Sequence, residues 1–357
     1  MDEDLNKWGL GSRLKTESLS DSPYFPWIHY VFIDGQNILK WVGPDLSIDL
    51  AFTDNIQSQA SAIFDPPKVL LTGGLVTTII KLAAQLVTAG VFVAFGSTNP
   101  VNPEWRPDPK CHLGIFLTVD SLLKDKEFKW DRLCLPWIEE DERVTLFFFL
   151  VISMLRFIVL HELGHIYYGH GRTDEGRLMM IVEGNSSKED TRRKAIVSQA
   201  KEIIADSFAL GKYFLLLNGE YDSSNIDTMR KLIRDKMLNS PRMRLRAILI
   251  SAFLVFQLLD RNNWTNKAAK LATHPPAPFR MKALYATALE LKFPKLPENE
   301  IIEEISLANT LGDAILSIGL NVYPNHYWLE SIEGKEFDSH FHAIHKEMAN
   351  WQEKATS

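Results

Sequence analysis

Short runs of hydrophobic and aromatic positions mark the first third of the chain. The run from Trp27 to Ile33 is β-branched and aromatic, which predicts a strand, and Asp34-Gly35 after it is a turn signal. Leu46 to Phe52 alternates in a similar way, and Leu113 to Val119 is a further candidate strand. Residues 75–95 predict a helix followed by a strand. Together these segments predict a mixed α/β region.

Longer apolar segments with helix end signals fill the rest of the chain. Predicted helices cover residues 141–168, 188–217, 242–260, 278–291 and 298–318. Gly169 ends the first of these helices, and Asn218-Gly219 ends the second. Pro275, Pro276 and Pro278 delimit the start of the fourth. The second part of the chain is therefore predicted to be mainly helical.

Composition and charge exclude several classes of protein. The 357-residue chain has a net charge of -6, and because it lacks a basic footprint, nucleic acid is not expected as a partner. Its two cysteines, Cys111 and Cys134, are too few for a disulfide framework and form no C-x-x-C pair. The acidic start, MDEDLNKWGL, does not resemble a secretory signal. We therefore expect a cytoplasmic protein with reduced cysteines.

Two apolar stretches raise the question of membrane contact. Residues 69–97 include Lys81 and Gln85, and residues 144–160 include Arg156. A spanning helix needs about 20 apolar residues, and an Arg near its middle is costly. The pattern favours a buried core helix, and membrane association stays the minority interpretation.

The candidate chemistry begins with His161-Glu162-Leu163-Gly164-His165. Histidines four residues apart lie on one face of a helix, so a single metal ion can bind both imidazoles. Zinc suits such ligands and lowers the pKa of its bound water, from which Glu162 can take a proton as general base. The alternative is a charged face on an ordinary helix. The preceding apolar run favours the zinc site, because burying these polar groups without a use is expensive.

The third protein ligand has two candidates. His170 lies nine residues after His161, about half a turn out of phase on a continuous helix. The HExxHxxGxxH pattern of the metzincins also fails, because position 168, where it needs Gly, is Tyr, and position 171, where it needs His, is Gly. His170 is therefore expected beside the metal site or at the surface.

Glu202 and Asp206 form the better candidate pair. They lie four residues apart on a largely apolar helix, so they share one face. Glu202 can complete the metal site, and Asp206 can accept the other ring N–H of a ligand histidine. The alternative is an acidic pair on a solvated face. The sequence thus predicts His161, His165 and Glu202 as zinc ligands.

These residues resemble the gluzincins, and most closely the branch that contains HtpX and the prenyl-protein endopeptidases. Three segments carry the resemblance: HELGHIYYGH from His161, EIIADSFAL from Glu202 and THPPAPFRMKAL from Thr273. It implies that His274 helps to hold the substrate carbonyl or the developing oxyanion, and that Arg280 braces the site through a carboxylate. That branch usually carries several membrane spans, so the soluble Lit-type and ImmA-type proteases are the better match.

The resulting expectation is an α+β protein in three parts. Residues 1–130 form a mixed α/β region of unassigned role, residues 131–295 a mainly helical zincin-like metallopeptidase core, and residues 296–357 a helical tail. His340, His342 and His345 fall in that tail. They are interpreted as part of a solvated amphipathic segment, with an accessory metal site as the alternative.

The predicted function is hydrolysis of peptide bonds in a protein or peptide substrate by a zinc endopeptidase. The metal-activated water attacks, and Glu162 acts as general base and then as general acid. The rival interpretation is a non-catalytic, metallopeptidase-like binding or sensor protein. Glu162 argues against it, because a purely structural zinc needs no base. The sequence predicts no oligomeric state.

Overall fold

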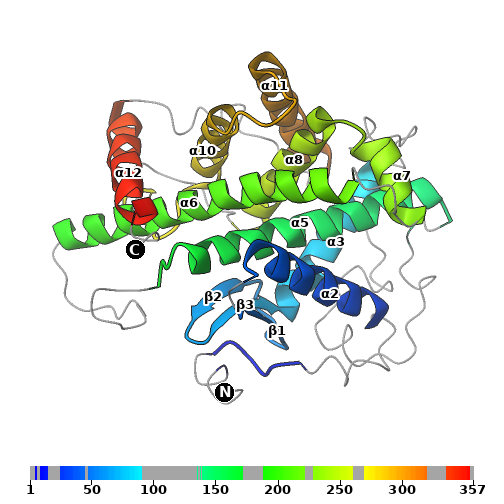
Figure 1. Cartoon of the computed structure of the whole chain (residues 1–357), viewed down its shortest axis with the longest axis horizontal. Helices are drawn as coiled ribbons and strands as arrows, with labels where there is room; N and C mark the ends of the chain where they lie inside the picture. Colours follow the sequence, from blue (N-terminus) through cyan, green and yellow to red (C-terminus); the bar gives the residue numbers. More distant parts are fainter. Residues whose placement is uncertain are drawn as a thin grey trace.

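The computed structural model describes residues 5, 9–14, 25–44, 47–90, 135, 137, 139–171, 188–221, 228–259, 269–319 and 335–353. The candidate strand from Leu113 to Val119 and both cysteines lie outside these ranges. The first elements are α2 (Phe25–Val42), β1 (Asp49–Thr53), β2 (Ala60–Phe64), β3 (Pro67–Thr72) and α3 (Gly73–Ala89). A small sheet with a mainly helical remainder confirms the α+β class (Figure 1).

Helices make up the rest of the described structure. They are α5 (Asp141–Tyr167), α6 (Lys188–Tyr221), α7 (Thr228–Met237), α8 (Pro241–Leu259), α10 (Ala277–Glu290), α11 (Glu298–Ala314), the π-helix η4 (Ile315–Gly319) and α12 (Lys335–Glu353). The helices predicted over 141–168, 188–217, 242–260, 278–291 and 298–318 are confirmed, with two changes. The last one is the α-helix α11 followed by the π-helix η4. Gly219 lies inside α6, which runs on to Tyr221 instead of ending at Asn218.

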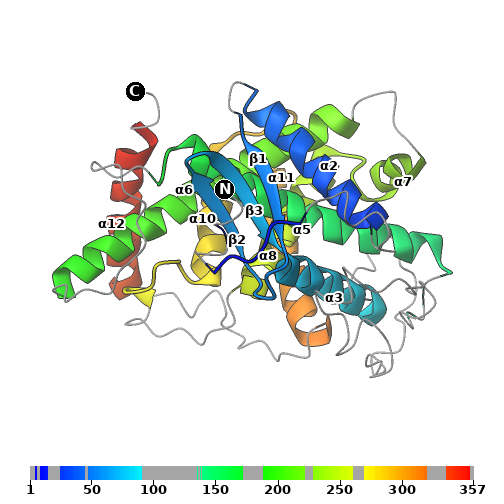
Figure 2. The ribbon, with the colours of Figure 1, turned by 90° about the horizontal axis from the view of Figure 1, so that it is seen from below.

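The sheet is mixed and has the order β1-β3-β2. Asp49 of β1 stands opposite Lys68 in the parallel pair, and Ala60 of β2 stands opposite Leu71 in the antiparallel pair. Figure 2 shows the sheet against α5, with α3 leading away from the end of β3. Thr72 caps α3, because its hydroxyl accepts a hydrogen bond from the backbone N–H of Leu75.

The predicted strand from Trp27 to Ile33 is wrong, since this segment belongs to α2. Along the second half of α2, Gly35, Ile38 and Leu39 are buried, whereas Trp41 is exposed, which is helical spacing. Asp34-Gly35 is not a turn. A Cβ on Gly35 would lie 2.6 Å from Leu50 Cδ2, so the glycine allows α2 to approach β1 closely. The contact between α2 and β1 explains the glycine in Asp34-Gly35, and the local sequence pattern could not show this contact.

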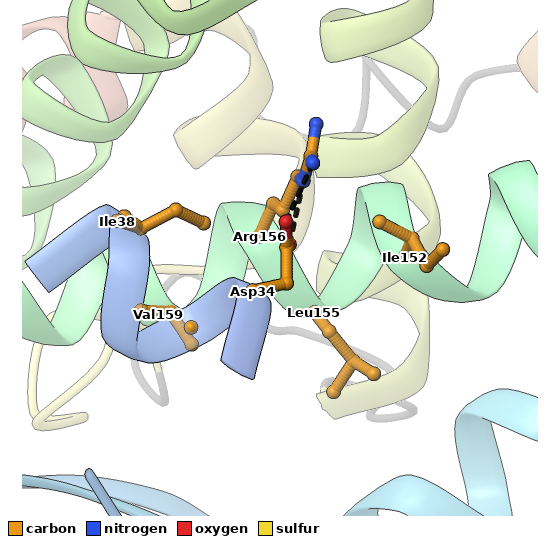
Figure 3. Close-up of a pocket in the computed structure, with 7 residues that line it drawn as sticks. Asp34, Ile38, Ile152, Leu155, Arg156 and Val159 are labelled. Carbon is orange, nitrogen blue, oxygen red and sulfur yellow. Dashed lines mark hydrogen bonds and ion pairs between the residues drawn. The ribbon is translucent and has the colours of Figure 1, made fainter. Parts of the chain in front are cut away.

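Arg156 interrupts the apolar run of α5 because it forms an ion pair with Asp34 of α2. Its Nε donates to Asp34 Oδ2 and its Nη2 to Asp34 Oδ1, each at 2.7 Å. Ile38 of α2, together with Leu155 and Val159 of α5, lines the small pocket around this pair (Figure 3). The bidentate geometry compensates the guanidinium charge inside an apolar contact.

The helix α5 lies at the centre of the molecule. In Figure 1 it runs alongside α6, with α2, α3 and the sheet on one side and α8 on the other. One hydrophobic core joins the sheet to these helices, and most of α5, the helix that carries His161 and His165, is buried in it. Among the described helices, α5 alone is long and apolar enough to cross a membrane, but 89% of that apolar window is buried inside the protein.

Replacement of Asp34 by Ala is expected to destabilise the protein by about 3 kcal/mol, because it leaves the Arg156 guanidinium buried without this carboxylate. The double variant Asp34→Leu/Arg156→Met should recover most of the loss. Chemical denaturation of the three proteins measures both effects. A single variant within roughly 0.5 kcal/mol of the wild type would contradict the role given to this pair.

Candidate metal centre

Three predicted ligands meet between α5 and α6. The Nε2 atoms of His161 and His165 lie 3.2 Å apart, since the two residues are one turn apart on the last turns of α5. Glu202 of α6 places its Oε2 3.4 Å from His161 Nε2 and its Oε1 3.3 Å from His165 Nε2. One ligand atom from each of these side chains lies within 4.8 Å of the other two, and the three residues together could hold a metal ion.

Small residues allow the two helices to come this close. A Cβ on Gly164 would lie 3.1 Å from the Cα of Ala205 and 3.2 Å from Cδ1 of Phe208. Backbone therefore faces backbone at the point where α5 and α6 touch. Because Ala205 is three residues after Glu202, this contact sets how far the Glu202 carboxylate lies from the histidines.

Asp206 joins His161 to Arg280. The His161 Nδ1 lies 2.8 Å from Asp206 Oδ1, so with a proton on Nδ1 the ring donates to the carboxylate. Arg280 of α10 donates to the same carboxylate from Nε at 2.8 Å and from Nη2 at 2.6 Å. Its guanidinium also lies over the ring of Phe256, 4.1 Å from the centroid. This is the bracing contact that the resemblance implied for Arg280.

The buried charged groups of this cluster shift one another's pKa values. Burial alone would lower the pKa of His161, but the carboxylates of Asp206 and Glu202 outweigh it and raise the pKa to about 10. Burial opposes ionisation of Asp206, yet Arg280 and His161 hold its pKa below the ordinary value. Burial likewise opposes the charge on Arg280, and Asp206, Glu202 and Glu162 raise its pKa. A metal ion that binds His161 would therefore compete with a proton for the imidazole.

Glu162 and His274, the two other predicted site residues, are less buried than His161 and Glu202. Glu162 is half-buried on α5, next to His161 in the sequence, and its charge contributes to the raised pKa of Arg280. His274 precedes α10 with 68% of its side chain exposed, and its Nε2 lies 3.8 Å from Glu202 Oε1. The structure therefore places an exposed histidine side chain next to the Glu202 carboxylate.

His170 lies beside the site and is buried, with 5% exposure. His170 would be half a turn out of phase with His161 only on a helix that continues to residue 170, but α5 ends at Tyr167 and the chain reverses at Gly169. The Nδ1 of His170 lies 2.8 Å from the Nδ1 of His165. Burial, followed by the nearby His165 and Lys201, lowers the pKa of His170 to about 2, so its ring is neutral.

A buried glutamine on α6 anchors the segment that leads to His274. Gln199 donates from Nε2 to the carbonyl oxygens of Ala269 and Ala272, each at 2.7 Å. The Nε2 of His340 lies 3.0 Å from Gln199 Oε1. His340 is 1% exposed, so the solvated interpretation is wrong for it, because α12 buries one face against α6.

The residues of this site fall within a segment that matches a known protein family. A family model described as Peptidase U49 matches residues 113–300, more than half of the chain. This chain belongs to the Peptidase U49 family. The matched segment of this Peptidase U49 member contains α5, α6 and α10, and thus every side chain from His161 to Arg280 discussed above. Membership supports a peptidase, a hydrolase that acts on proteins or peptides.

The N-terminal sheet and α12 lie outside the segment matched to Peptidase U49. No curated protein and no solved structure matches the chain. The contact between His340 of α12 and Gln199 therefore joins the matched segment to a helix outside it.

Replacement of Gly164 by Val is expected to push α6 away from α5. Overpacking should lower the free energy of unfolding by about 1–3 kcal/mol, and the displaced Glu202 should weaken metal binding. Gly211→Val on α6 is the matched control, since a Cβ there meets only Leu291 Cδ1 at 3.5 Å. The control should stay within about 1 kcal/mol of the wild type. Equal effects in denaturation and metal titration would contradict the close-approach argument.

Proposed function

We propose that this peptidase is a zinc-dependent endopeptidase. The observation that supports it best is the convergence of two imidazole nitrogens and one carboxylate oxygen at a single point between α5 and α6. Three protein donors of this kind are typical of a catalytic zinc, whereas a structural zinc usually has four. The resemblance of the three sequence segments to the gluzincins supports the same assignment.

The donor set fits zinc on chemical grounds. Borderline-soft imidazole nitrogens and a carboxylate suit zinc, whereas the hard cations calcium and magnesium prefer oxygen ligands alone. The Asp206 carboxylate already accepts from His161 Nδ1, so His161 offers its Nε2 to the metal. His161, His165 and Glu202 would hold the ion.

Each surrounding residue then has a defined task. When bound, zinc supplies a Lewis acid that lowers the pKa of a water molecule towards neutrality. Glu162 takes a proton from the attacking water and delivers it to the leaving amine. Asp206, itself held by Arg280, keeps the His161 ring in one tautomer and orientation. His274 donates to the substrate carbonyl or to the developing oxyanion from the exposed side of Glu202.

Replacement of Glu162 by Gln is expected to abolish turnover and leave zinc bound. Loss of a positioned base lowers the rate by about 100-fold to 10,000-fold, whereas none of the three ligands is changed. Cleavage is measured by a proteome-wide terminal-peptide screen, and zinc by elemental analysis. The control is Glu139→Gln, an exposed glutamate just before α5.

Two outcomes would contradict the proposal. If Glu162→Gln cleaves at the wild-type rate, the general-base role is wrong. If the wild-type protein holds one zinc per chain and cleaves nothing in the screen, a non-catalytic binding or sensor protein is the better description.

A further inference from the structure

The backbone at the end of α5 brings His170 back to the site. Gly169 has a φ of 63°, and its N–H donates to the carbonyl of Ile166 at 3.0 Å. The N–H of His170 donates to the carbonyl of His165, also at 3.0 Å. These two bonds form a Schellman motif, in which a left-handed residue reverses the chain over the last helical turn. The motif usually pairs two apolar side chains, but here it pairs His170 with His165.

Neighbouring elements hold the His170 ring in place. The ring of Tyr168 lies nearly parallel to it, at 18° and with centroids 5.8 Å apart. The ring of Trp351 from α12 is nearly perpendicular to it, with the ring centroids 6.3 Å apart. Lys201 of α6 donates from Nζ to the His170 carbonyl at 2.7 Å and lies over the Trp351 ring. Ring and backbone of His170 are thus fixed by three separate elements.

The contact between the two rings assigns their protons. If His165 binds the metal through Nε2, its remaining proton is on Nδ1, which lies 2.8 Å from His170 Nδ1. His170 Nδ1 must then be the acceptor, so the His170 proton is on Nε2. This Nε2 is buried and has no hydrogen-bond partner within the described part of the chain. Within the described part of the chain, the His170 ring therefore makes its hydrogen bond through Nδ1, and its partner is His165.

We propose that His170 is a positioning residue that accepts the Nδ1 proton of His165 and aims the His165 Nε2 at the metal. This proposal rests on the proposed zinc site. His161 has an anionic acceptor, Asp206, whose charge Arg280 balances. The acceptor of His165 is the neutral ring of His170, and this acceptor adds no further negative charge beside Glu202 and Glu162. The two ligand histidines are thus oriented by different chemistry, and the neutral acceptor preserves the electron-withdrawing power of the metal.

Zinc affinity of the full-length protein tests the proposal directly. His170→Leu removes the acceptor, and His170→Asn restores an acceptor near the position of Nδ1. The dissociation constant is measured by competition with a chromophoric chelator, and folding by circular dichroism. We expect His170→Leu to bind zinc about 10- to 100-fold more weakly and His170→Asn to recover most of the affinity. His345→Leu, an exposed histidine of α12, is the matched control and should bind zinc as the wild type does.

Failure of this proposal and failure of the zinc site are distinguishable. A wild-type protein that binds no zinc overturns the proposed function. A wild-type protein that binds one zinc, with His170→Leu binding equally tightly, overturns only the role of His170.

A second measurement covers a variant that fails to fold. Nitrogen-15 NMR of histidine-labelled, zinc-loaded wild-type protein reports the tautomers. The proposal requires a proton on Nδ1 of His165 and on Nε2 of His170. A bare Nδ1 on His165 would overturn it.

Discussion

The close contact of α5 with α6 at Gly164 and Ala205 is the constraint on which the site depends. One helix supplies two histidines and the other supplies Glu202, so the group of three forms only where the two helices meet. Their separation is set by backbone packing and not by flexible side chains. Gly164, the second of the two variable positions in the motif, is therefore part of the site, although it carries no chemistry of its own.

Burial of charge is the second constraint, and it explains why the cluster extends beyond three ligands. His161, Glu202, Asp206 and Arg280 are all buried, and each would be costly there without its neighbours. Arg280 from α10 balances Asp206, which in turn orients His161. On the other side, His170 contacts His165. Lys201 donates to the His170 carbonyl, and Trp351 of α12 contacts both of these residues. Helices far apart in the sequence thus contribute to one electrostatic unit.

The sequence predicted what depends on spacing along one helix and missed what depends on contacts between elements. His161 with His165, and Glu202 with Asp206, are each one turn apart, so their shared faces were readable. The strand at Trp27 was wrong because aromatic and β-branched residues also suit a helix that packs on a sheet. The sequence predicts that Gly169 ends a helix, but it does not show that the chain then turns back and brings His170 against His165. The burial of His340 depends on α12 packing against α6, which no local pattern reports.

X-ray absorption spectroscopy at the zinc edge of the zinc-loaded, full-length protein tests the central claim most directly. The account predicts two imidazole nitrogens at about 2.0–2.1 Å and oxygen donors at about 2.0–2.2 Å, with no sulfur. Replacement of Glu202 by Gln should weaken or abolish this signal. A spectrum with sulfur donors, or one with three or more imidazoles, would contradict a site made of His161, His165 and Glu202.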